Sequence, residues 1–195
     1  MLAVLAASAC GGSPAQPPGV SEPALPAPSS SAPAPAAAPA LGVPVGADKI
    51  APYTPEQIRD ATPQGRTYKY RIVREGKPTK LDEMRFTRVD AQGADISSTS
   101  REEGGAAGPP KSRTVTWAEL RAHGEFPRAL VTVADEPVDV PAGHFSCIVF
   151  TLKDPDKNEV SRFYFAREIP GAPVLYFTEK DGKRVMTATL LEHRR

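Results

Sequence analysis

Nearly all charged side chains lie in one part of this chain, and this distribution limits which residues can fold. Residues 11–47 contain ten prolines and ten alanines, and Glu22 is the only charged residue among them. The first basic residue is Lys49. A segment with so few bulky apolar side chains cannot offset the entropy lost on ordering, so we predict a disordered linker over residues 10–47. Residues 48–195 then form one β-rich globular domain, long enough to bury a core without disulfide staples.

The charge of this domain is nearly balanced. Only Glu22 of the 23 acidic residues precedes Asp48, so the domain carries 22 acidic and 24 basic side chains, a formal charge of +2. Proteins that bind nucleic acid present clustered basic faces, so this balance predicts no nucleic-acid partner. It also gives no attraction to an anionic membrane surface. No apolar run approaches the roughly 18 residues that a membrane-spanning helix needs.

The N-terminus has the character of the end of a secretory signal peptide, an apolar run followed by small residues. Residues 7–9 with Cys10 resemble the lipobox of bacterial lipoproteins, although Ala7 stands where that family usually has Leu. In that family the cysteine is acylated on sulfur and becomes the mature N-terminus. The resemblance implies a signal peptide over residues 1–9, whose basic segment we expect to precede Met1, and lipidation of Cys10.

A lipid anchor followed by a long linker predicts where the protein resides. As a polyproline II helix the linker would span at most ~115 Å, and as a coil about 35 Å, so it can hold a domain clear of a membrane. We therefore expect a protein of the cell envelope that reaches a membrane through the lipid on Cys10. The expected site is the periplasmic face of the outer membrane.

Two short helices are predicted from their capping signals. Thr54 offers an N-cap hydroxyl, and Gln57 occupies the third helical position of a capping box. Thr116 and Glu119 form a second capping box. We expect Trp117, on this second helix, to anchor the core, because buried tryptophans contribute large apolar contact areas.

The rest of the domain has the alternation typical of strands. Apolar and basic side chains alternate with a period of two over residues 68–72, and a less regular strand follows over residues 81–89. A polar strand around Ile96 belongs at a sheet edge or has one solvent-exposed face. Further strands are predicted over residues 130–140, 144–152, 160–166, 174–178 and 184–191.

The spacing of these strands predicts the fold class. Turn residues recur about every 8 to 12 positions, which is typical of an antiparallel sheet, a barrel or a sandwich. Residues 145–150 place apolar side chains on both faces of one strand, so we expect both faces to be covered. The predicted fold is mainly β: a single antiparallel, curved sheet or half-open barrel with two short helices, preceded by the disordered linker.

One turn between strands carries a second resemblance. The segment Val140-Pro141-Ala142-Gly143-His144-Phe145 is similar to the Val-Pro-Ala-Gly-x-Phe segment of uncharacterised periplasmic and lipoprotein β domains. Some of those domains are considered relatives of the Lol lipoprotein carriers, whose half-open β-barrel shelters acyl chains. Pro and Gly make the bend and Phe fills the core, so the resemblance implies a fold and carries over no catalytic residue.

The sequence predicts neither a metal nor a cofactor. Residues 154–158 have the oxygen-rich start of a calcium loop, but the Gly and Glu that the loop requires are missing, so we interpret them as a turn. His144 and Cys147 are three apart on a strand and point to opposite faces. His123 closes a helix, and His193 lies in a basic tail where we expect solvation.

Motifs for a chemical reaction are also missing. The sequence has no G-x-S-x-G, P-loop or dinucleotide-binding glycine pattern. Asp135, Glu136 and Asp139 lie close together, and we interpret them as residues of a turn before and around a proline. Cys147 has apolar neighbours on its own face, which favours a buried structural thiol over a reactive one. We therefore expect a protein that is not an enzyme.

The leading hypothesis is a non-catalytic, membrane-tethered envelope lipoprotein whose β domain binds an apolar ligand or a protein partner. A ligand carrier would have a cavity lined by aromatic residues. The alternative is a structural or assembly scaffold of an envelope complex, with a filled core and an exposed apolar patch. The third hypothesis is an enzyme without a recognisable motif, with a polar cleft. The residues predicted to line a carrier's cavity are Tyr68, Tyr70, Phe163 and Phe165.

Overall fold

The computed structural model describes residues 42–154 and 156–195, and its largest element is one antiparallel sheet. Nine strands follow the order β6-β5-β4-β3-β12-β11-β10-β9-β8, so the last strand returns between β3 and β11. The strands are β3 (Thr67–Arg74), β4 (Lys80–Val89), β5 (Gly93–Glu102), β6 (Lys111–Thr116), β8 (Val131–Val140), β9 (Gly143–Asp154), β10 (Glu159–Ala166), β11 (Leu175–Lys180) and β12 (Lys183–Arg194).

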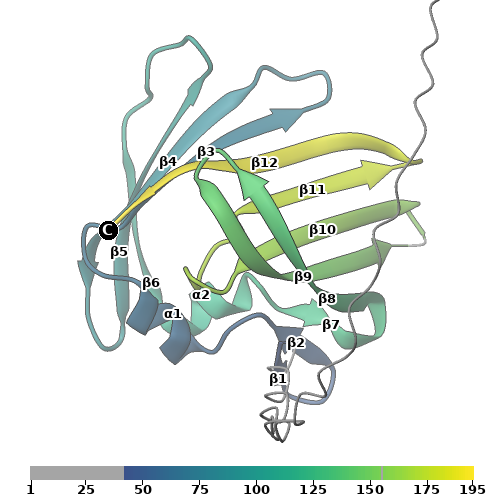
Figure 1. Cartoon of the computed structure of the whole chain (residues 1–195). Helices are drawn as coiled ribbons and strands as arrows, with labels where there is room; N and C mark the ends of the chain where they lie inside the picture. The colour runs from purple at the N-terminus through teal and green to yellow at the C-terminus, as the bar shows by residue number, and fades with distance from the viewer. Residues whose placement is uncertain (1–41, 155) are drawn as a thin grey trace, which may run out of the picture. The chain divides into compact units, whose positions relative to one another are not determined.

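This sheet confirms the predicted fold class. It is strongly curved (Figure 1), and its end strands β6 and β8 do not pair with each other, so the curve stays open. An open antiparallel sheet of this kind keeps one concave and one convex face. The side chains of Tyr68, Tyr70, Met84 and Phe86 share one face by their spacing and register, and we call this the inner face.

Both predicted helices are present and begin at the predicted caps. In α1 (Pro55–Ala61), Thr54 accepts a hydrogen bond from the Gln57 amide at 3.2 Å, and its own amide donates to the Gln57 side chain at 2.8 Å. In α2 (Trp117–Ala122), Thr116 and Glu119 form the same reciprocal pair. Trp117 is 5% exposed, as expected of a core anchor. A single turn of 3-10 helix, η1 (Arg128–Leu130), precedes β8.

A small second sheet was not predicted. Its strands follow the order β1-β2-β7. They are β1 (Val43–Val45), β2 (Lys49–Ala51) and β7 (Phe126–Pro127). Strand β1 lies inside the segment predicted as disordered linker, so the folded structure begins before the predicted start at Asp48. Strands of two or three residues are too short to show a period of two, so only their pairing with one another reveals them.

The core surrounds β9, which is buried on both faces as predicted. The exposed fractions of Cys147, Ile148, Val149 and Phe150 are all 4% or less. On the inner side, the Phe150 ring stacks on Phe126 of the small sheet with a centroid distance of 5.0 Å. The small sheet therefore covers part of the inner face of the large one.

The hairpin of β8 and β9 reaches the last strand of the sheet. At its turn, the Ala142 amide donates a hydrogen bond to the Leu190 carbonyl of β12 at 3.4 Å. The Phe145 ring lies 5.9 Å from the His193 ring. The predicted solvation of His193 is therefore wrong, because β12 continues through it and places the imidazole half-buried beside the hairpin.

Burial of His193 predicts a pH-dependent stability. Burial lowers the pKa of His193 below its ordinary value of 6.5, and the charges of Arg66 and Arg195 lower it further. The unfolded chain then takes up a proton first as the pH falls, so stability decreases below about pH 6.5. We expect thermal melts between pH 7.5 and 5.0 to show this loss in the natural chain and a smaller one in His193→Gln. Parallel curves for the two proteins would contradict this assignment.

Two further expectations about strands need correction. The polar strand β5 was expected either at a sheet edge or with one solvent-exposed face. It has neighbouring strands on both sides, so it is not an edge strand, and several of its residues are exposed. Strand β6 lies at one edge of the sheet; its first four residues are exposed, and it was not predicted. Asp135, Glu136 and Asp139 lie within β8 rather than in a turn, because Pro137 is tolerated on an edge strand.

Several predictions fall on residues 1–41, which lie outside the described part of the chain. They are the signal peptide over residues 1–9, the lipidated Cys10 and most of the linker. Within the described residues, no helix is long and apolar enough to cross a membrane.

Candidate functional site

Two adjoining cavities open on the inner face of the large sheet. The first has a volume of about 580 Å³, and the second about 400 Å³. Ile58 of α1 and Leu120 of α2 line the second cavity opposite the sheet, so the two helices form part of its wall. Both volumes fall in or near the range of pockets that take small molecules.

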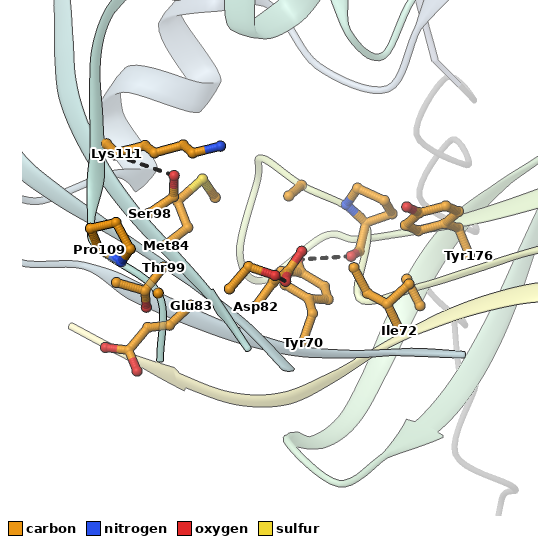
Figure 2. Close-up of a pocket in the computed structure, with 15 residues that line it drawn as sticks. Tyr70, Ile72, Asp82, Glu83, Met84, Ser98, Thr99, Pro109, Lys111 and Tyr176 are labelled. Carbon is orange, nitrogen blue, oxygen red and sulfur yellow. Dashed lines mark hydrogen bonds between the residues drawn. The ribbon is translucent and has the colours of Figure 1, made fainter. Parts of the chain in front are cut away.

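The first cavity has an apolar floor and a polar rim (Figure 2). Strands β3 and β4 supply Tyr70, Ile72 and Met84. The rim is formed by Lys111 of β6 and by hydroxyl groups of β5, where the Ser98 hydroxyl donates to the Lys111 carbonyl at 3.3 Å. In Figure 2 the Lys111 side chain extends beside Met84 and Ser98.

A carboxylate also lies in the wall of the first cavity. Asp82 of β4 accepts a hydrogen bond from the Ser100 hydroxyl at 2.5 Å. The Tyr176 phenol stands on the same wall, and burial raises its pKa, with a further contribution from Asp82. This cavity therefore combines an apolar surface with two acidic side chains, Asp82 and Glu83, and one basic side chain, Lys111.

The second cavity lies deeper and is largely aromatic. Tyr68, Phe86, Phe163 and Phe165 line it together with residues of both helices. The rings of Phe163 and Phe165 are stacked, with centroids 6.4 Å apart. These rings offer a ligand apolar surface.

A loop separates the two cavities. Ala172 and Pro173, between β10 and β11, line both, and so do Met84 and Tyr176. The Tyr70 hydroxyl donates to the Pro173 carbonyl at 3.0 Å, which holds the loop against β3. Burial raises the pKa of Tyr70 well above its ordinary value, so the phenol stays protonated and keeps this hydrogen bond.

All four aromatic residues predicted to line a cavity lie on these walls. Tyr70 belongs to the first cavity, and Tyr68, Phe163 and Phe165 belong to the second. Phe163 and Tyr176 stand opposite each other on β10 and β11, and their rings stack at 5.6 Å. The predicted residues therefore lie on two strands, β3 and β10, that are separated by β12 and β11 in the curved sheet.

Behind Tyr68 lies a buried arginine that the sequence did not single out. Arg66 is 1% exposed and donates from Nη1 to the Tyr68 hydroxyl at 3.0 Å. Its Nε has no hydrogen-bond partner among the described residues. This guanidinium is not part of either cavity wall, and it fixes the orientation of a ring that is.

Other residues of the cavity walls were missed. Met84 belongs to a predicted strand, but it lines both cavities only because of the fold. Arg113 of β6 lines the second cavity, and the strand that carries it was not predicted. The sequence around Ala172 and Pro173 is typical of an ordinary turn. No local sequence signal indicates that this turn folds over the inner face of the large sheet.

The polar residues considered for chemistry do not converge on one another. The carboxylates of β8 pair with separate partners: Asp135 with Arg167, Glu136 with Arg162, and Asp139 with His144. No group of three or more potential metal ligands occurs in the part of the chain that the structure describes. Burial raises the pKa of the Cys147 thiol to about 12, so this thiol remains protonated at neutral pH.

Comparisons with known proteins were made by sequence and by structure. No protein-family model matches the sequence, and no curated protein matches it. Among solved structures, the chain is similar to a "putative exported protein with YmcC-like fold" from Bacteroides fragilis, at 10% identity and a TM-score of 0.46 over 69% of this chain and 97% of that one. A hypothetical protein from Chlamydia trachomatis is similar at 9% identity and a TM-score of 0.42 over 73% of this chain and 93% of that one. Similarities this low carry no argument about function.

Proposed function

We propose that the domain is a non-catalytic binding module that takes an apolar ligand between its curved sheet and its two helices. The observation that carries this proposal is the pair of adjoining cavities, which share Met84, Ala172, Pro173 and Tyr176. A scaffold protein has no need to leave such space beneath its helices, because filling it with side chains would add packing contacts.

The chemistry of the walls supports an apolar ligand. The second cavity is lined on the sheet side by Met84 and aromatic side chains, together with Arg113, and on the helix side by residues that include Ile58 and Leu120. Binding there would remove apolar ligand surface from water, which stabilises a complex by roughly 25 cal/mol per Å² of apolar surface buried. We propose further that the lipidated Cys10 and the linker hold this module at an envelope membrane, where amphiphiles with long apolar chains are found.

The scaffold alternative has less support in the described residues. Among residues 42–154 and 156–195, only Val73 and Leu130 are exposed large apolar side chains, at 42% and 47%. Exposed strand β6 could still pair with a partner strand. A protein partner at that edge would leave both cavities unoccupied.

Native mass spectrometry tests the proposed function directly. The Cys10→Ser chain, exported to a bacterial periplasm and purified without detergent, should carry a reproducible extra mass that organic extraction removes and that analysis identifies as an apolar compound. A clean apo mass that does not bind added apolar compounds would overturn the ligand proposal and favour a scaffold.

A cavity-filling substitution provides the second test. Ala172 lines both cavities, so Ala172→Phe should place a ring in the space that a ligand needs. We expect the affinity for the neutral probe N-phenylnaphthylamine, followed by fluorescence, to fall by about tenfold or more because the apolar contacts are replaced. The control is Ala134→Phe, at an exposed position of β8. Equal probe affinity in the two variants would place the binding elsewhere.

A further inference from the structure

The edge strand β6 turns two basic side chains toward the inner face. Lys111 lines the first cavity, and Arg113 lines the second. They are two residues apart on a strand, so they share a face, and their register partners on β5 are Ser98 and Ile96. Neither forms an ion pair with a carboxylate among the described residues.

The wall of the second cavity contains basic side chains but no acidic ones. Arg113, Arg121 and His123 line it, and no Asp or Glu does. Arg121 is neutralised by Glu125, at 2.9 Å, and Glu125 also binds Lys49 at 3.2 Å. Arg113 therefore remains as a positive charge at an aromatic cavity without a bonded counter-charge.

Glu119, a carboxylate near Arg113, already uses its Oε2 atom in the cap of α2. Glu119 accepts hydrogen bonds from the Thr116 amide at 2.7 Å and the Thr116 hydroxyl at 2.9 Å, which complete the cap of α2. These bonds are the main reason that the pKa of Glu119 is lowered, and the charges of Arg113 and His123 contribute less. The donors of the Arg113 guanidinium are thus available to another acceptor.

The first cavity differs from the second in the charges of its wall. Asp82 and Glu83 line it and would repel an anion, whereas Lys111 would attract one. The acidic residues outnumber the basic one there. An anionic group is favoured only at the second cavity, where the positive charge of Arg113 adjoins the apolar space.

We propose that the ligand is an amphiphile with an anionic head group and that Arg113 binds this group while the apolar chain enters the second cavity. This inference rests on the proposed function, since it names the class of ligand for the same site. A guanidinium forms charge-assisted hydrogen bonds with carboxylate or phosphate oxygens. Arg113 therefore decides specificity, and the aromatic wall supplies the apolar contacts.

The test compares two ligands that differ only in charge. Dodecanoate and dodecanol, at monomeric concentrations and pH 8, are titrated calorimetrically into the Cys10→Ser chain and into the same chain with Arg113→Gln. We expect the chain with Arg113 to bind dodecanoate more tightly than dodecanol. Arg113→Gln should weaken the affinity for dodecanoate about tenfold and change the affinity for dodecanol by less than about twofold. Added salt should weaken dodecanoate binding alone.

Arg101→Gln is the control because it removes the same charge. Arg101 is exposed on β5 and, by the alternation along that strand, lies on the opposite face from Ser98 and Ser100. Binding of both ligands with equal affinity, or an equal loss in both variants, would overturn the role of Arg113 and leave the cavity as an apolar site. Binding of neither ligand would overturn the proposed function itself.

Discussion

Phe150→Ala is expected to lower the free energy of unfolding by about 3–5 kcal/mol, the usual cost of removing a buried aromatic side chain. Phe150 is 0% exposed and packs against Phe126 at 5.0 Å and Phe165 at 5.7 Å, measured between ring centroids. These contacts join the two sheets, so the cavity left by the substitution cannot close by moving one loop. Urea denaturation followed by the fluorescence of Trp117 measures the change.

Leu130→Ala is the control for this prediction. Leu130 is 47% exposed at the end of η1, so its removal should cost well under about 1 kcal/mol. A similar loss of stability in the two variants would mean that the rings around Phe150 are not the packing centre of the domain. Because Phe150 does not line either cavity, a folded Phe150→Ala protein at low temperature should still bind the neutral probe.

Cys10→Ser is expected to abolish stable association with the membrane. Each buried CH₂ of an acyl chain contributes about 0.8 kcal/mol to membrane binding, so two or more chains anchor a protein firmly and their loss releases it. The domain has no compensating attraction, because its formal charge is close to zero. Fractionation of cells that export the two proteins, with metabolic labelling by a palmitate analogue, measures both the lipid and the location.

Cys147→Ala separates the two cysteines of the chain. Cys147 is buried in β9, so this variant should keep both the label and the membrane fraction. The proposed anchor would be refuted if Cys147→Ala lost the palmitate label. It would also be refuted if Cys10→Ser remained associated with the membrane.

The helices and most strands could be predicted because their signals are local. Both capping boxes rest on residues three positions apart, and the structure contains both hydrogen bonds of each. The apolar residues on both sides of β9 correctly indicated a strand covered on two faces. Turn residues such as Asp181 and Gly182, with positive φ angles of 50° and 74°, marked the hairpin between β11 and β12.

The missed features depend on contacts between distant residues. Strand β6 is polar and follows a Gly/Pro loop, so only its pairing with β5 makes it a strand. Strands β2 and β7 meet through Ile50 and Phe126, which are 76 positions apart in the chain. Four aromatic residues of the cavity walls could be named from the sequence. Their division between two cavities and the position of Arg113 beside one of them could not be predicted, because both follow from the curvature of the sheet.

The loop that divides the cavities has a consequence for how such a domain evolves. Ala172 and Pro173 lie between β10 and β11, outside the strands of the sheet. Insertions and deletions are tolerated in loops far better than in strands. A lineage could therefore change the length of ligand that it accepts by altering this one connection, with the sheet, the helices and the core inherited unchanged.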